Sequence, residues 1–322
     1  MHELMGDLTR AADRSTSHLV ARLQSFPTDS ARERFLQGQG LLAASAMLRE
    51  IGISVPDRKG NESGHLIDPA ATEGNLLARL KESGVDASLA GASLAAWTLY
   101  LDSAQRERTD VLILMPMASC RLAWPILSDM GFRPVRAQSK VTREEVWHRS
   151  DSEVPMRVVL RWGVCDHPLL ARRFSISGAL AHSRELEGPV AGVRGLDRIY
   201  SVLYMALRYF DARSFKTRLI DLLDQDLAWR ALSEDDCREL LQLARQRGVA
   251  GLLEAHLRMV RAVFDTPVPD EMLTSLAQSA RQEHTSRLIR ARNSGFRYHW
   301  LAARTAQGFR PRWRHLLAAF KG

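Results

Sequence analysis

The chain is organised around residues 89–116, which read LAGASLAAWTLYLDSAQRERTDVLILMP. Gly91 follows a short extended approach and lets the backbone turn tightly. Small and apolar residues at helical spacing then predict a helix over residues 92–101, with a polar loop after it. The apolar run of residues 111–115 ends at Pro116, as expected for a strand that is covered on both faces. The stretch therefore predicts a strand end, a glycine turn, a short helix, a loop and a buried strand.

Several residues of this stretch match a family pattern. Tyr100, Asp102, Arg106 and Asp110 have the spacing Tyr-x-Asp-x-x-x-Arg-x-x-x-Asp, and Gly91 stands before the helix. In these residues the chain resembles the polymerase-β-like nucleotidyltransferases, and most closely their uncharacterised bacterial nucleotidyltransferase family. The resemblance covers residues 84–272. It implies an α+β fold in which a small mixed β-sheet is joined to N-terminal helices and to a largely helical C-terminal half.

The chain departs from the family pattern at three positions. Ala90 stands where the family has a lysine, Leu112 where it has the second aspartate of Asp-x-Asp, and Val159 where it has a third aspartate. Aspartates at i and i+2 point to the same face of a strand, and carboxylates placed in this way hold the divalent metals that stabilise nucleotidyl transfer. Leucine and valine offer no oxygen to Mg²⁺. The resemblance therefore implies a degenerate metal site in which Asp110 is left alone.

The resemblance also implies a small set of site residues and cofactors. Asp110 is the candidate catalytic residue and a weak metal ligand, and Gly91, Ser93 and Arg106 are the candidate nucleotide-binding residues. Mg²⁺ and a nucleoside triphosphate are the implied cofactors. Structural alternatives stay open for each residue: Asp110 pairs with Arg106 or Arg108, Gly91 serves only the turn, Ser93 bonds its own backbone, and Arg106 staples the loop to itself.

The pattern along the chain predicts three regions. Residues 1–66 form an N-terminal helical lead, residues 67–195 the nucleotidyltransferase-like core, and residues 196–322 a helical C-terminal domain with a basic amphipathic tail. Within the core, helical spacing predicts a helix over residues 71–83. Runs rich in β-branched residues predict strands over residues 141–149 and 156–162.

A further helix is predicted over residues 119–130. Its apolar residues Leu122, Ile126 and Met130 fall at i, i+4 and i+8 and are expected to face inward. Pro125 lies within the run, so the helix is either kinked there or begins late, with the proline in its first turn.

In the helical half the sequence predicts several helices and the ends of one of them. Amphipathic runs predict helices over residues 196–210 and 215–227. Ser233, with Asp236 three residues later, predicts a capping box at the start of the next helix. Gly248 predicts the C-terminal end of that helix.

The composition is that of a globular chain, since 45% of its 322 residues are apolar and 25% are charged. No apolar stretch reaches the ~18 residues that a membrane-spanning helix needs, and the N-terminus lacks the basic-then-apolar order of a signal peptide. Cys120, Cys165 and Cys237 form no Cys-x-x-Cys pair, which favours reduced thiols over a disulfide or zinc framework. We therefore expect a cytoplasmic protein without a transmembrane segment.

The surplus of positive charge lies in the tail. Residues 281–322 contain nine Arg and one Lys against one Glu, a net charge of +9 in a chain whose net charge is +8. An apolar stripe at helical spacing, from Phe309 through Trp313 to Phe320, favours docking of the tail on the body of the protein. The candidate partner-binding residues are Arg310, Arg312, Trp313 and Arg314, and the partner is an acidic molecule, nucleic acid or a membrane surface.

These observations support three hypotheses of function. The first is a nucleotidyltransferase-like protein with a degenerate metal site, a pseudoenzyme that acts as a binding or accessory subunit for a peptide or protein partner. The second is an active nucleotidyltransferase that places a nucleoside monophosphate on a small molecule, peptide or protein, with a metal site centred on Asp110. The third is an adaptor that meets nucleic acid or a membrane surface through its basic tail.

Overall fold

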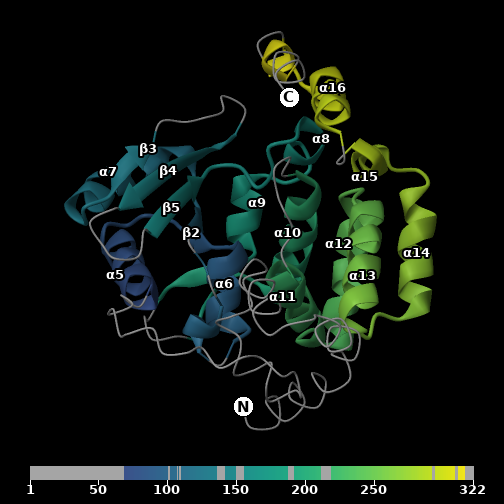
Figure 1. The fold of residues 1–322 in the computed structure, drawn as a ribbon, viewed down its shortest axis with the longest axis horizontal. Helices are drawn as coiled ribbons and strands as arrows, with labels where there is room; N and C mark the ends of the chain where they lie inside the picture. Colours follow the sequence, from purple (N-terminus) through teal and green to yellow (C-terminus); the bar gives the residue numbers. More distant parts are fainter. Residues whose placement is uncertain are drawn as a thin grey trace, which may run out of the picture.

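The computed structural model describes residues 69–100, 102–106, 108, 110–135, 142–149, 156–187, 192–211, 219–291, 294–308 and 311–315. The helical lead expected over residues 1–66 and the candidate residue Arg310 lie outside these ranges. In the described part of the chain a mixed sheet of seven strands is followed by a mostly helical half (Figure 1). The expected α+β fold class is confirmed.

The strands of the sheet come from the first part of the described chain. They are β1 (Ser88–Leu89), β2 (Asp110–Leu114), β3 (Arg133–Val135), β4 (Glu144–Arg149), β5 (Met156–Arg161), β6 (Ser183–Glu185) and β7 (Arg194–Leu196). Their order in the sheet is β3-β4-β5-β2-β1-β7-β6. The pairs β2–β5 and β1–β7 are parallel, and the other neighbours are antiparallel. The predicted strands β2, β4 and β5 are present, whereas β3, β6 and β7 are too short to show a period in the sequence.

Helices flank the sheet and then build the second half. They are α5 (Pro69–Glu82), α6 (Gly91–Thr98), α7 (Met117–Asp129), α8 (Pro168–Ala171), α9 (Ile176–Ala181), α10 (Arg198–Asp211), α11 (Leu219–Arg230), α12 (Glu234–Gln246), α13 (Ala250–Phe264), α14 (Asp270–Ala280), α15 (Arg287–Ala291) and α16 (Gly295–Thr305). Short 3₁₀ turns lie at Ser103–Gln105 and His284–Ser286. None of the described helices is both long enough and apolar enough to cross a membrane.

Two expectations about α7 need correction. The helix begins at Met117, well before Pro125, so a late start with the proline in the first turn is wrong. Leu122 is 55% exposed, so its expected inward position is wrong, whereas Ile126 faces inward as expected, together with Cys120 and Ala123. The small side chain of Ala123 is fully buried, which lets the helix lie close to its neighbours.

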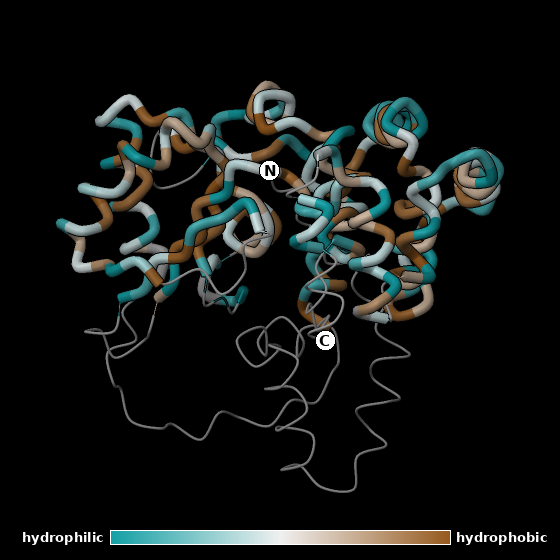
Figure 2. The backbone as a smooth tube through the Cα atoms, turned by 90° about the horizontal axis from the view of Figure 1, so that it is seen from above, coloured by the Kyte–Doolittle hydropathy of each residue, from teal (hydrophilic) through white to brown (hydrophobic). Residues whose placement is uncertain are grey.

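Helix α10 joins the two halves. It contacts α6 on the sheet side and α11, α12 and α13 on the other. One hydrophobic cluster therefore runs from Leu76 in α5, through Tyr204 in α10, to Leu288 in α15. Figure 2 shows hydrophobic residues gathered inside both halves, with hydrophilic residues on the outer sides of the helices.

The predicted end signals of α12 are confirmed. Ser233 accepts a hydrogen bond from the backbone N–H of Asp236, and the Asp236 side chain accepts one from the Ser233 backbone, which completes the capping box. Gly248 follows the helix with a φ of +60°, a conformation that favours glycine.

Candidate functional site

A cavity of about 340 Å³ lies between the sheet and the helical half. Its sheet side is lined by Gly91, Asp110, Leu112, Glu144, Arg157 and Val159, and its helical side by residues of α10, α11 and α13 that include Tyr204, Arg208, Asp221, Asp224 and His256. The volume falls in the range of about 300–1,000 Å³ that is typical of small-molecule sites. The cavity thus gathers the sheet-side candidates Gly91 and Asp110 in one place.

The floor of the cavity is apolar. Leu112 of β2 and Val159 of β5 are register partners in a parallel pair, so the two positions that the resemblance assigns to aspartates lie side by side. Gly91 has a φ of +61°, and a Cβ atom added there would meet Leu112 Cδ2 at 3.2 Å. Gly91 is therefore required both by the backbone turn and by the close approach of the floor.

Asp110 lies beside this floor and is 40% exposed. Its carboxylate is 3.5 Å from Nε of Arg157, its register partner on β5. The partners expected from the sequence, Arg106 and Arg108, bond carboxylates of the helices α11 and α5. The guanidinium of Arg108 bonds Glu73 of α5 at 2.6 Å.

Ser93 ties helix α6 to strand β2. It is fully buried, and its hydroxyl donates to the carbonyl of Asp110 at 3.2 Å and accepts from the N–H of Leu112 at 3.4 Å. The hydroxyl thus bonds the strand backbone, and not the backbone of its own helix as the structural alternative expected. Its role in nucleotide binding stays a prediction.

Arg106 joins the loop before β2 to helix α11. It is 1% exposed, its Nε and Nη2 donate to Asp224 at 2.7–2.9 Å, and Nη2 also donates to Asp221 at 2.9 Å. The hydroxyl of Tyr100 donates to Asp224 at 2.8 Å. Burial raises the pKa of Asp224, while Arg106 acts in the opposite direction. Arg106 therefore staples the loop to the helical half, and its binding of a nucleotide stays a prediction.

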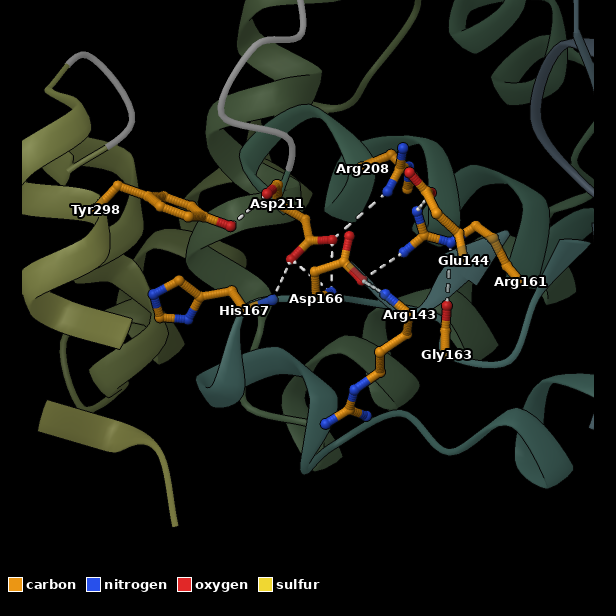
Figure 3. Close-up of polar contacts among 9 residues, drawn as sticks. All are labelled: Arg143, Glu144, Arg161, Gly163, Asp166, His167, Arg208, Asp211 and Tyr298. Atoms are coloured by element: carbon orange, nitrogen blue, oxygen red, sulfur yellow. Dashed lines mark hydrogen bonds and ion pairs between the residues drawn. The ribbon is translucent and has the colours of Figure 1, made fainter. Parts of the chain in front are cut away.

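A second polar network lies next to the cavity and reaches the C-terminal helices (Figure 3). Its members are Arg143, Glu144, Arg161, Gly163, Asp166, His167, Arg208, Asp211 and Tyr298. Arg161 donates to Glu144 at 2.6 Å, and its Nη2 lies 3.0 Å from Asp166. The backbone N–H groups of Asp166 and His167 donate to the buried carboxylate of Asp211 at 2.7–3.0 Å. Tyr298 of α16 completes the chain by donating to the carbonyl of Asp211.

Sequence reasoning missed most of the helical side of the cavity. Arg157 could have been found, because it stands two residues before Val159 on one strand and so shares its face. Tyr204 and Arg208 are one turn apart on α10 and share a helix face. Which partner that face meets depends on the packing of the two halves.

The residues do not fit the two-metal centre that the complete set of family aspartates would hold. Among the described residues, no group of three or more His, Cys, Asp or Glu is placed so that it could hold a metal ion. The positions beside Asp110 carry leucine and valine, which cannot ligate a hard cation.

A family model described as uncharacterised nucleotidyltransferase matches residues 71–265 of the chain. These residues run from α5 to the end of α13 and include the whole sheet and every wall of the cavity. None of the curated proteins matches the chain.

Proposed function

The chain belongs to the uncharacterised nucleotidyltransferase family, and we propose that it binds a nucleotide in the cavity above Leu112 and Val159 and acts as a binding or accessory subunit. The observation that carries this proposal is the register of β2 and β5, which puts two aliphatic side chains where metal-binding carboxylates are required. The cavity keeps the size of a ligand site, and its floor offers an apolar surface to a base or a sugar.

The alternative is an active transferase that places a nucleoside monophosphate on a small molecule, peptide or protein. Metal binding at Asp110 distinguishes the two functions. Titration with MgCl₂ or MnCl₂ should give no micromolar binding, because one carboxylate supplies too few oxygens. Labelled ATP, GTP, CTP and UTP should be tested separately, and at least one should bind without passing label to an acceptor. Asp110→Asn should change nucleotide affinity by no more than about fivefold, the range of an exposed ion pair.

The matched control is Asp129→Asn on α7, whose side chain is 68% exposed and lies outside the cavity. Micromolar metal binding that disappears in Asp110→Asn, together with transfer of label, would instead establish the active transferase.

The C-terminal helices favour a second candidate function, contact with an acidic partner. Trp313 is 52% exposed, so the expectation that the apolar stripe buries this tryptophan is wrong. Phe296 and Trp300 of α16 are 48% and 46% exposed and stack on each other with ring centroids 6.0 Å apart. Arginines accompany these rings, and Figure 1 places α16 at one end of the molecule. Exposed aromatic rings among arginines favour single-stranded nucleic acid over other acidic partners, since bases stack on such rings.

A fluorescein-labelled oligo-dT should therefore bind the full chain, and the affinity should fall steeply as salt rises. Trp313→Ala should weaken binding by about tenfold, in line with the loss of one base–aromatic stack. Trp124→Ala is the matched control, because Trp124 is also exposed (42%) but lies on α7. Binding that does not depend on salt, or an equal loss of oligo-dT affinity in both variants, would rule out this function.

A further inference from the structure

Three residues around the cavity carry hydrogen-bond donors that form no close hydrogen bond with the described residues. The hydroxyl of Tyr204 is buried and has no hydrogen-bond partner among the described residues. The guanidinium of Arg208 is 3.6 Å from Asp211, and that of Arg157 is 3.5 Å from Asp110. Both contacts are longer than the roughly 3.2 Å limit of a good N–H···O bond. By contrast, Arg106 is held by bonds of 2.7–2.9 Å.

The three residues that carry these donors lie around the same floor. Tyr204 and Arg208 lie one turn apart on α10, and Arg157 shares a strand face with Val159 on β5. A ring carbon of Tyr204 is 4.0 Å from the place where a Cβ of Gly91 would be. All three residues line the cavity.

Three of the acidic residues that line the cavity are bonded to other arginines. Asp221 and Asp224 are bonded to the buried Arg106, and Glu144 is bonded to the buried Arg161. The fourth, Asp110, faces Arg157 only at 3.5 Å. Arg157 and Arg208, with their longer contacts, are the cations best placed to meet a ligand.

Donor chemistry limits what the ligand can be. A guanidinium has only donors, and it keeps its charge at any working pH. Burial raises the pKa of the Tyr204 phenol, although Arg208 and Arg161 oppose this effect, so the hydroxyl stays protonated at neutral pH and can donate. A group that satisfies all three must present several acceptor oxygens and a negative charge, which describes a phosphate.

We propose that Arg157, Arg208 and Tyr204 form a subsite that holds the phosphate groups of the ligand without a divalent metal. The subsite supplies through arginines the positive charge that the missing carboxylates would otherwise recruit as metal ions. This inference rests on the proposed nucleotide binding, and it adds how the phosphates are held.

The test is calorimetric titration with sodium tripolyphosphate and with the four nucleoside triphosphates, each in EDTA and again with Mg²⁺. The wild-type chain should bind tripolyphosphate in EDTA. Tyr204→Phe should weaken this binding by about tenfold, as expected for a lost hydrogen bond to a charged group, and its melting temperature should be equal or higher because an unpaired buried hydroxyl is removed. Arg157→Gln, at a side chain that is 48% exposed, should weaken binding by at least as much without unfolding the protein.

Tyr200→Phe is the matched control. Tyr200 stands one turn before Tyr204 on α10, and its hydroxyl is also buried without a partner among the described residues, but it does not line the cavity. Its replacement should have the same thermal effect as Tyr204→Phe and should leave the affinity for tripolyphosphate unchanged.

The outcomes separate this inference from the proposed function. Nucleotide binding that needs Mg²⁺, or that is equal in Tyr204→Phe and wild type, overturns the subsite and leaves nucleotide binding standing. A second outcome is that tripolyphosphate binds in EDTA and its affinity falls as expected in Tyr204→Phe and Arg157→Gln, while no nucleotide binds more tightly than tripolyphosphate. This outcome supports the subsite and overturns the nucleotide as its ligand. Absence of binding by every probe overturns both.

Discussion

Replacement of Arg161 by methionine should lower the free energy of unfolding by about 3–5 kcal/mol, because it leaves buried carboxylates without their cation. The Arg161 side chain is 1% exposed, and it bonds Glu144 at 2.6 Å, the carbonyl of Gly163 at 3.2 Å and Asp166 at 3.0 Å. Asp166 in turn bonds Asp211 of α10 through its backbone N–H. Arg161 therefore helps to join the sheet to the helical half.

Urea unfolding followed by far-UV circular dichroism measures this change. Arg238→Met is the matched control, because Arg238 pairs with Asp235 on the surface and its side chain is 74% exposed. This control should unfold like the wild type, since exposed pairs contribute little. A loss below about 1 kcal/mol in Arg161→Met would show that the network does not hold the halves together.

Acid should destabilise the wild-type chain more than the His167→Asn variant. His167 is fully buried, and its pKa is lowered from 6.5 to about 3 by burial, with smaller contributions from His315 and His299. The unfolded chain binds a proton near pH 6.5, whereas the folded chain does not until about pH 3. The stability that depends on a neutral His167 is therefore complete above pH 6.5 and is lost as the pH falls toward 3.

Between pH 6.5 and 4.5 the free energy of unfolding of the wild-type chain should fall by about 2–3 kcal/mol more than that of the variant. This corresponds to about 1.4 kcal/mol per pH unit. Asparagine keeps an acceptor for the N–H of Leu169, to which Nδ1 of His167 bonds at 3.2 Å. Burial raises the pKa of Asp211, Asp224 and Asp226, which works in the opposite direction, but these groups are present in both proteins. Urea unfolding at several pH values gives the difference, and parallel curves would contradict a neutral buried His167.

The sequence alone was sufficient for features that depend on a few neighbouring residues. Gly91 marks a turn that needs a positive φ, and the capping box of Ser233 and Asp236 lies within one helical turn. Leu112 and Val159 could be placed side by side because the resemblance aligned two strands whose side chains alternate with a period of two. The α+β fold class follows from the same local patterns and from the family pattern around Asp110.

Tertiary structure decided every choice between competing partners. Helix α7 turns Ala123 inward and Leu122 outward because the surface that it meets favours a small side chain, which a count of apolar positions cannot reveal. Asp110 meets Arg157 across the strand pair, whereas Arg106 reaches Asp224, 118 residues further along the chain. An arginine can bond any carboxylate within reach, so its partner is set by which elements pack together and not by its neighbours in sequence. The charged groups available to a ligand in the cavity are those that packing has not bonded closely to another residue. For that reason only the folded chain shows Arg157, Arg208 and Tyr204 around one floor.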